Sequence, residues 1–155
     1  MLFGSAPIRT GGHPDGRALL SRLYADHIGG AEPEIALTDR GKPYYRQSPV
    51  HFSISHTRHH VFCVLSDRPV GIDAEEIDRD IDLRLAEKIL SANELAQFQT
   101  APDPRRALLT FWVLKEALAK ATGEGLRGYP NHTDFSLDDP RVTEKDHCLV
   151  AVIQL

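Results

Sequence analysis

The stretch FWVLKEALAKATGEGL, residues 111–126, combines a helical repeat of apolar residues with three charged side chains. The charges belong to Lys115, Glu116 and Lys120, close to a Phe-Trp pair, and two glycines then interrupt the repeat. A charge beside a buried aromatic face has to be solvated, paired or bound to another group. Most charged residues on helices are simply exposed to water. What these three do therefore depends on the chemistry that the rest of the chain brings to this helix.

The segments before this stretch predict where its helix begins. In APDPRR, Asp103 is a favourable N-cap residue and Pro104 suits the first helical position, so we predict a helix over about 104–121. SANE is a capping box in which Ser91 and Glu94 satisfy each other's backbone amides, which predicts a second helix starting at Ser91. Leucines at helical spacing in DLRLAEKIL predict a short helix before it.

The remaining segments predict one more helix and several strands. GRALLSRLYADHIGG (16–30) has leucines on a helical repeat and ends on two glycines. The predicted strands are EIALTD (34–39), VHFSIS (50–55), HHVFCVLSD (59–67), PVGIDAE (69–75), TDFSL (133–137) and HCLVAVIQL (147–155). The second to fourth of these follow one another through short turns, which predicts an antiparallel meander, and the last two predict a hairpin. The fold class is therefore α+β.

Composition narrows the classes of protein. A chain of 155 residues, 41% hydrophobic, suffices for one domain or for two small lobes that share a core. A net charge of -4 argues against a nucleic-acid binder. Cys63 and Cys148 lie in apolar runs and are expected as buried thiols without a disulfide. No segment has the apolar length of a membrane span, and the first residues lack the apolar core of a signal peptide, so we expect a cytoplasmic protein.

Two carboxylates in GIDAEE belong either to an exposed polar strand face or to a cation site. On a strand, Asp73 and Glu75 project from the same face. At about 4 Å and an effective dielectric of about 20, two such charges repel by about 4 kcal/mol before screening. An exposed polar face escapes most of this repulsion, and a bound cation removes it. Oxygen ligands without cysteine favour Mg²⁺, and Glu116 adds a third carboxylate if helix and strand meet.

Donors suited to phosphate oxygens lie elsewhere in the chain. The candidates are Lys42 in GKP, Ser55 and His56 in SISHT, and Lys115 and Lys120. These residues also have structural interpretations: Lys42 as a lysine in a turn, His56 as a histidine at a strand end, and Lys120 as the partner of Glu116 in a helical ion pair worth a few tenths of a kcal/mol. Zinc at the histidines of HTRHH is not expected, because no carboxylate or thiol lies at a recognised zinc spacing.

The order of these motifs resembles a known family. GKP, FSISHT, GIDAE and FWVLKEALAKATGEGL follow one another as in the 4′-phosphopantetheinyl transferases, over about residues 15–130. The holo-acyl-carrier-protein synthases share D-x-E and K-E-A-x-x-K, but in them the SISH segment comes last. The order here is that of the branch typified by the enzyme that activates surfactin synthetase.

The resemblance implies a fold and an activity. The fold would be two pseudo-symmetric lobes of antiparallel sheet with packed helices, here a reduced N-terminal lobe (about 1–66) and a C-terminal lobe (about 67–155). The activity would be Mg²⁺-dependent transfer of the 4′-phosphopantetheine arm of coenzyme A to a serine of an apo acyl or peptidyl carrier protein, releasing 3′,5′-adenosine bisphosphate. Such activation serves fatty acid, polyketide and nonribosomal peptide biosynthesis. Partners would be coenzyme A and the carrier, with no nucleic acid or membrane.

The resemblance also assigns roles to the candidate residues. Asp73, Glu75 and Glu116 would hold Mg²⁺ against the pyrophosphate, and Glu116 is in addition the candidate base for the carrier serine. Lys120 would contact the α-phosphate. Lys115 would lie beside it, and Lys42, Ser55 and His56 would grip the nucleotide and its 3′-phosphate. The alternatives are a non-catalytic coenzyme A or nucleotide-binding module of the same fold, and a structural partner of a synthase complex.

Overall fold

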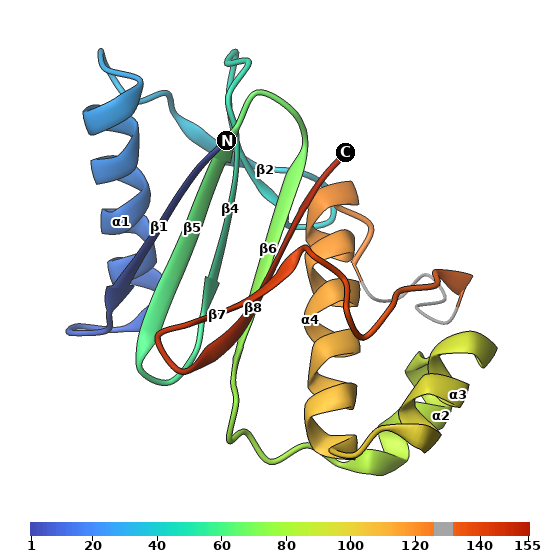
Figure 1. Ribbon diagram of the computed structural model, residues 1–155. Coiled ribbons are helices and arrows are strands. Elements are labelled where there is room, and N and C mark those ends of the chain that lie inside the picture. Colours follow the sequence, from blue (N-terminus) through green and yellow to red (C-terminus); the bar gives the residue numbers. More distant parts are fainter. Residues whose placement is uncertain (126–131) are drawn as a thin grey trace.

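The structure is a computed structural model that describes residues 1–125 and 132–155. Its helices and antiparallel sheets confirm the α+β class. The elements in chain order are β1 (Leu2–Pro7), α1 (Gly12–His27), β2 (Ile35–Leu37), β3 (Pro43–Tyr45), β4 (His51–His56), β5 (His60–Ser66), β6 (Val70–Glu76), the 3-10 helix η1 (Leu83–Leu85), α2 (Ala86–Ile89), α3 (Ala92–Thr100), α4 (Pro104–Thr122), β7 (Val142–Lys145) and β8 (Cys148–Gln154) (Figure 1).

Two three-stranded antiparallel sheets form the framework. The N-terminal sheet has the order β1-β5-β4 and packs against α1, whereas the C-terminal sheet has the order β6-β8-β7 and packs against α4 (Figure 1). The short hairpin β2–β3 is separate from both. Each sheet thus has one long helix as its main cover.

Side chains rather than a backbone ladder join the two sheets. Ser53 Oγ of β4 accepts the backbone N–H of Ile72 on β6 at 3.1 Å, and Ser55 Oγ accepts that of Ala74 at 3.2 Å. Because both numbers rise together, the two strands run in the same direction. We call this contact the serine seam. An apolar cluster that includes Phe62, Ile72 and Val150 packs beside it.

The predicted meander of three consecutive strands is therefore wrong at its third strand. β4 and β5 form an antiparallel hairpin, but β6 pairs with β8 along its whole length, from Val70 opposite Gln154 to Glu76 opposite Cys148. The short turn before β6 is compatible with either partner. β5 lies between β1 and β4 and has both edges paired, so it has no free edge for β6, whereas β8 offers β6 the apolar run CLVAVI.

The predicted helix ends agree closely with the structure. Asp103 caps α4 by accepting the N–H of Arg106, and Gly123 ends that helix with a left-handed φ of 76°. Ser91 and Glu94 form the predicted capping box of α3. These ends were predictable because capping depends on a few neighbouring residues.

Three local predictions need correction. TDFSL is not a strand: the partner of β8 is β7, and the turn between them places Asp146 and His147 at positive φ values of 53° and 59°. DLRLAEKIL divides into η1 and α2. The strand β1 had no counterpart in the predictions, because LFGSAP includes a glycine, a serine and a proline among its apolar residues and forms an edge strand.

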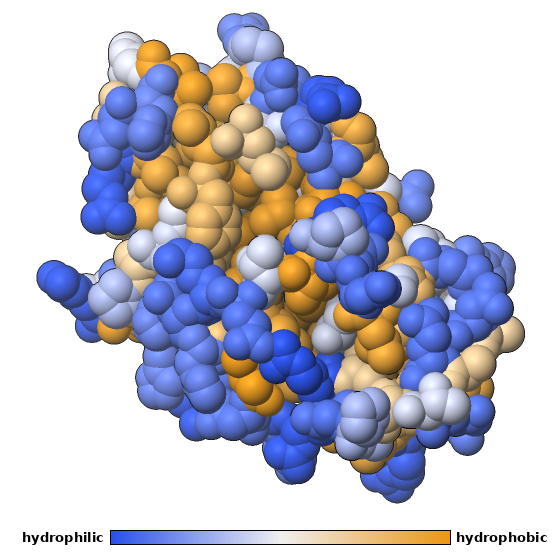
Figure 2. All heavy atoms as spheres, viewed as in Figure 1, coloured by the Kyte–Doolittle hydropathy of each residue, from blue (hydrophilic) through white to orange (hydrophobic). Residues whose placement is uncertain are grey.

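The interior and the surface agree with the composition. Cys63 and Cys148 are buried and free, as predicted. On the face shown in Figure 2, hydrophobic residues gather over the middle of the upper half and hydrophilic residues lie mostly around them. Within residues 1–125 and 132–155, no helix combines the length and the apolarity that crossing a bilayer requires.

Gly71 sets the distance between β6 and α4. A Cβ atom at this position would lie 1.9 Å from the backbone oxygen of Ala117 and 2.4 Å from the backbone nitrogen of Ala121. No real side chain tolerates such distances, so the helix backbone rests directly on the strand. This contact sets the distance between α4 and the part of β6 that carries Asp73 and Glu75.

We expect Gly71→Ala to lower the free energy of unfolding by about 3 kcal/mol, because a backbone obstacle cannot rotate away as a side chain can. Gly30→Ala is the control: its Cβ would meet open space, and only its positive φ opposes alanine, at a cost of about 1 kcal/mol. Urea denaturation of both variants measures the difference. Equal losses would show that α4 does not depend on close contact at Gly71.

Candidate active site

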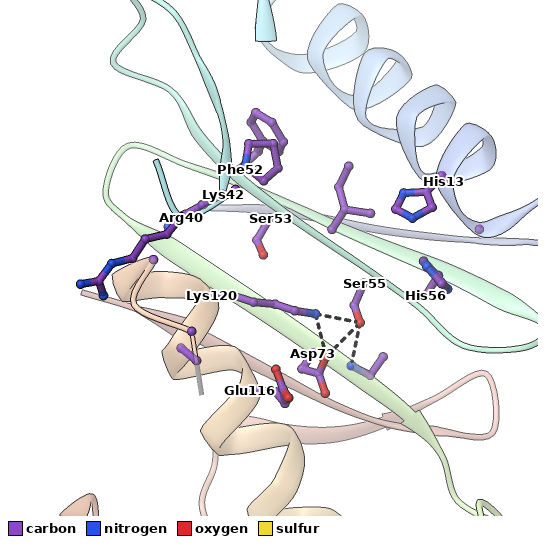
Figure 3. A pocket seen from close by; sticks show the side chains of 18 of the residues that line it. His13, Arg40, Lys42, Phe52, Ser53, Ser55, His56, Asp73, Glu116 and Lys120 are labelled. Carbon is purple, nitrogen blue, oxygen red and sulfur yellow. Dashed lines mark hydrogen bonds and ion pairs between the residues drawn. The ribbon is translucent and has the colours of Figure 1, made fainter. Parts of the chain in front are cut away.

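A cavity of about 770 Å³ opens between the N-terminal sheet, β6 and α4 (Figure 3). Side chains reach it from α1, from the β2–β3 hairpin and its turn, from β4 at the serine seam, and from α4. The cavity therefore lies where the two sheets meet, and its polar groups come from segments far apart in sequence.

Asp73 is the most buried carboxylate of the cavity. Its side chain is 8% exposed, and its Oδ1 accepts bonds from Lys120 Nζ at 2.7 Å and from Ser55 Oγ at 3.1 Å (Figure 3). Its Oδ2 is buried and has no hydrogen-bond partner among the described residues. Burial raises the pKa of Asp73, and the Lys120 ammonium opposes that rise. One oxygen of a buried carboxylate is thus left to receive a ligand.

Glu75 and Glu116 bring two more carboxylates to the cavity. Glu75 Oε1 accepts the indole N–H of Trp112 at 3.2 Å and forms an ion pair with Arg79. Burial raises the pKa of both glutamates, and the nearby charge of Asp73 raises each further. The structure thus brings together the three carboxylates that the sequence predicts as metal ligands, and their mutual repulsion calls for a cation.

The donor set fits a hard divalent cation, although no cluster of three metal-binding side chains is preformed within residues 1–125 and 132–155. The groups available are carboxylate oxygens, and Asp73 Oδ2 is a buried acceptor without a protein donor. Oxygen ligands of this kind suit Mg²⁺, which accepts one or two carboxylates and completes its shell with water or phosphate. Two of the carboxylates are paired with side-chain cations, Asp73 with Lys120 and Glu75 with Arg79.

Four of the five predicted phosphate donors line this cavity: Lys120, described above with Asp73, and Ser55, His56 and Lys42. Ser55 and His56 end β4, and the His56 ring lies 5.4 Å, centre to centre, from the His13 ring of α1 (Figure 3). Lys42 donates to the backbone oxygen of Ala121 at 2.7 Å, so its ammonium caps the last turn of α4. Desolvation by burial lowers the pKa of Lys42.

Lys115 is the predicted site residue that the structure does not bring to the cavity. It is 4% exposed, and its Nζ pairs with the fully buried Glu94 at 2.7 Å and donates to the backbone oxygen of Thr133 at 3.0 Å. Successive residues of a helix point about 100° apart, so Lys115 and Glu116 face different sides of α4. We therefore remove Lys115 from the phosphate-binding set: its role is to neutralise a buried glutamate.

Sequence reasoning missed several residues that line the cavity. Trp112 precedes Glu116 by one helical turn, and that spacing alone could have placed it on the same face. Arg79 lies four residues after Glu75 but in a turn, where no periodicity applies. Further lining residues depend on how α1 and the hairpin meet β4, which no local pattern encodes, among them Gly12, His13, Ile35, Leu37, Arg40 and Phe52.

Comparison with known proteins now identifies the family. A family model described as the 4′-phosphopantetheinyl transferase superfamily matches residues 69–149, which is more than half of the chain. The chain belongs to this superfamily. The matched span holds Asp73, Glu75, Glu116 and Lys120, and the SISH segment precedes it.

Named relatives of the superfamily match from about a third to three quarters of the chain. The 4′-phosphopantetheinyl transferase psf-1 of Bacillus pumilus is 39% identical over 120 residues, covering 74% of this chain and 51% of the relative. The holo-[acyl-carrier-protein] synthase of Cronobacter sakazakii is 45% identical over 64 residues, covering 37% and 51%. The solved holo-[acyl-carrier-protein] synthase of Thermotoga maritima matches 54% of this chain and 60% of its own at 27% identity, with a TM-score of 0.46. The chain spans about half the length of the curated relatives it matches.

The raised pKa values predict how this superfamily member responds to pH and cations. A carboxyl whose pKa is raised by folding stabilises the fold while protonated, and that contribution is lost as the pH rises through the folded pKa. Without divalent cations, Glu116→Gln should therefore raise the melting temperature at pH 7.5, with a smaller gain near pH 5. Added Mg²⁺ should stabilise the native chain at pH 7.5 and have little effect on the variant.

Differential scanning fluorimetry with and without Mg²⁺ measures these shifts. Glu87→Gln is the matched control, because Glu87 is exposed on α2 outside the cavity. A lower melting temperature for Glu116→Gln than for the native chain in metal-free buffer at pH 7.5 would contradict the repulsion among the three carboxylates.

Lys115→Met should destabilise the fold by about 3 to 5 kcal/mol, because it leaves Glu94 buried without its cation. Lys88→Met, at an exposed position of α2, should change the free energy of unfolding by less than about 0.5 kcal/mol. Chemical denaturation measures both. A Lys115→Met variant as stable as Lys88→Met would show that the buried pair is dispensable.

Proposed function

We propose that the protein transfers the 4′-phosphopantetheine arm of coenzyme A to a serine of an apo acyl or peptidyl carrier protein, with Mg²⁺, and releases 3′,5′-adenosine bisphosphate. The observation that carries this proposal is the meeting of Asp73, Glu75, Glu116 and Lys120 at one cavity. The family and the relatives named as 4′-phosphopantetheinyl transferases and holo-[acyl-carrier-protein] synthases support it. We propose a cytoplasmic reaction in a cleft between lobes of about 1–66 and 67–155.

In this proposal the carrier serine oxygen bonds to the phosphorus that carries the pantetheine arm. The pyrophosphate P–O bond on the far side breaks, the leaving bisphosphate takes the electron pair, and the serine proton passes to Glu116. A glutamate in a half-buried, negatively charged surrounding holds a proton better than an exposed one, which suits it to act as a base. Lys120 supplies positive charge where negative charge develops on the leaving phosphate.

The remaining groups would bind and orient the donor. Asp73, Glu75 and Glu116 are the residues that would hold Mg²⁺, which when bound would neutralise charge on the pyrophosphate oxygens. Ser55, His56 and Lys42 would contact the nucleotide and its phosphates. To contact a phosphate, the Lys42 ammonium would leave the backbone oxygen of Ala121 and donate to a phosphate oxygen instead. The flexible side chain of lysine permits this change of acceptor.

Mass spectrometry of a purified apo carrier, incubated with the protein, coenzyme A and Mg²⁺, tests the proposal directly. Asp73→Ala should lower kcat/KM for carrier modification by at least about 100-fold, because a charge-organising group is lost from the site. Glu87→Gln should retain full activity, and circular dichroism should show that both variants are folded.

The same assay separates the alternative of a non-catalytic coenzyme A-binding module. Such a module would bind coenzyme A in calorimetry, yet no carrier would gain mass under any metal condition. That outcome, or undiminished transfer by Asp73→Ala, would overturn the proposed function.

A further inference from the structure

Arg79 and Trp112 contact the same oxygen of one cavity carboxylate. Trp112 donates its indole N–H to Glu75 Oε1 at 3.2 Å, and the Arg79 guanidinium forms an ion pair with that atom. The centre of the guanidinium also lies 5.8 Å from the centre of the Trp112 ring. All three side chains line the cavity. Glu75 is thus held by one neutral and one charged donor.

The two donors differ in how firmly they are anchored. Trp112 belongs to α4, whose backbone rests on β6 at Gly71, and its side chain packs against the apolar core cluster. Arg79 lies in the turn after β6, and its side chain is 40% exposed. An ion pair with that much solvent exposure contributes little net free energy, so the guanidinium can leave at small cost.

A divalent cation on Glu75 would compete with Arg79 for the carboxylate. Its two positive charges repel a guanidinium at the same oxygen, whereas the neutral indole dipole tolerates the change. Asp73 is paired with Lys120 in a corresponding way. Two side-chain cations therefore pair with two of the three carboxylates, and within residues 1–125 and 132–155 these carboxylates do not form a preassembled ligand cluster.

We propose that Arg79 is a displaceable counter-ion of the cation site, and that Trp112 is a positioning residue that keeps Glu75 in place when Arg79 leaves. This inference rests on the proposed function, because it takes a divalent cation at the carboxylates as its premise. It assigns opposite effects to two side chains that bind the same oxygen: Arg79 weakens cation binding, and Trp112 strengthens it.

Binding of Mn²⁺ to the full chain, followed by electron paramagnetic resonance without coenzyme A or carrier, tests these opposite effects. Arg79→Gln should bind Mn²⁺ roughly two- to fivefold more tightly, the range that corresponds to losing a half-exposed competing charge. Trp112→Phe should bind roughly two- to tenfold more weakly, the range for one lost neutral hydrogen bond.

Two further variants control for charge. Arg79→Lys keeps a positive side chain and should leave the affinity within about twofold of the native value. Arg105→Gln removes an arginine that pairs with Asp80 at 3.8 Å outside the cavity, and it should leave the affinity unchanged. If Arg105→Gln raised the Mn²⁺ affinity as much as Arg79→Gln, the change in net charge alone would account for the gain, and the inference would be overturned.

Tryptophan fluorescence tests the displacement of Arg79 separately, because a purely structural arginine would not change the emission when Mg²⁺ binds. Trp112 is the only tryptophan in the sequence, so its emission reports on this cluster alone. Mg²⁺ should change the emission of the native chain as the guanidinium leaves the ring, and the change should be much smaller in Arg79→Gln. An equal change in both proteins would show that Arg79 stays where it is.

The outcomes distinguish this inference from the proposed function. If the native chain binds Mn²⁺ and transfers the arm, but Arg79→Gln binds no more tightly, the inference fails and the function stands. If the native chain transfers the arm but binds no Mn²⁺ in the absence of coenzyme A, the inference fails and the function stands. If it neither binds Mn²⁺ nor transfers the arm, both fail. The test does not depend on Trp112→Phe being folded, because Arg79 is a surface residue whose replacement leaves the core untouched.

Discussion

The serine seam is the contact on which the rest of the molecule depends. Where β4 and β6 meet, Ser53 and Ser55 accept the amide protons that a neighbouring strand would otherwise accept. The amides are thereby satisfied although the sheet is interrupted. Ser55 has a further role, because it also donates to Asp73. The interruption that separates the two sheets thus creates the cavity wall, and one hydroxyl serves both the framework and the site.

Charge at the cavity follows from this architecture. Gly71 lets α4 rest on β6, so the charged face of the helix lies over the carboxylates of the strand. Three carboxylates face Lys120 and Arg79, which leaves a deficit of one positive charge among these five groups. Burial keeps that deficit from being screened by water. A site of this kind favours ligands that bring positive charge and phosphate oxygens together, as a metal-bound pyrophosphate does.

The features that could be predicted from the sequence are those that depend on residues close together in the chain. The caps at Ser91 and Asp103 were correct because capping needs only a few residues, and the shared face of Asp73 and Glu75 follows from the period of a strand. The partner of β6 was missed because several apolar strands could have paired with it. Lys115 was misplaced because its buried partner, Glu94, lies on another helix. Long-range pairing and the burial of a charge are decided by the assembled fold.

The position of β8 has a consequence for how the chain folds as it is synthesised. β4 and β5 can pair as soon as both have left the ribosome, but Ile72 on β6 pairs with Val152, 80 positions later. Until β8 has been synthesised, β6 has no strand with which to form backbone pairing, although the N-terminal sheet can already be complete. Such long-range closure is slow and leaves apolar surface accessible to other chains. The strand that carries Asp73 and Glu75 is therefore secured late, and a nascent chain that stalls before β8 emerges would be a substrate for chaperones.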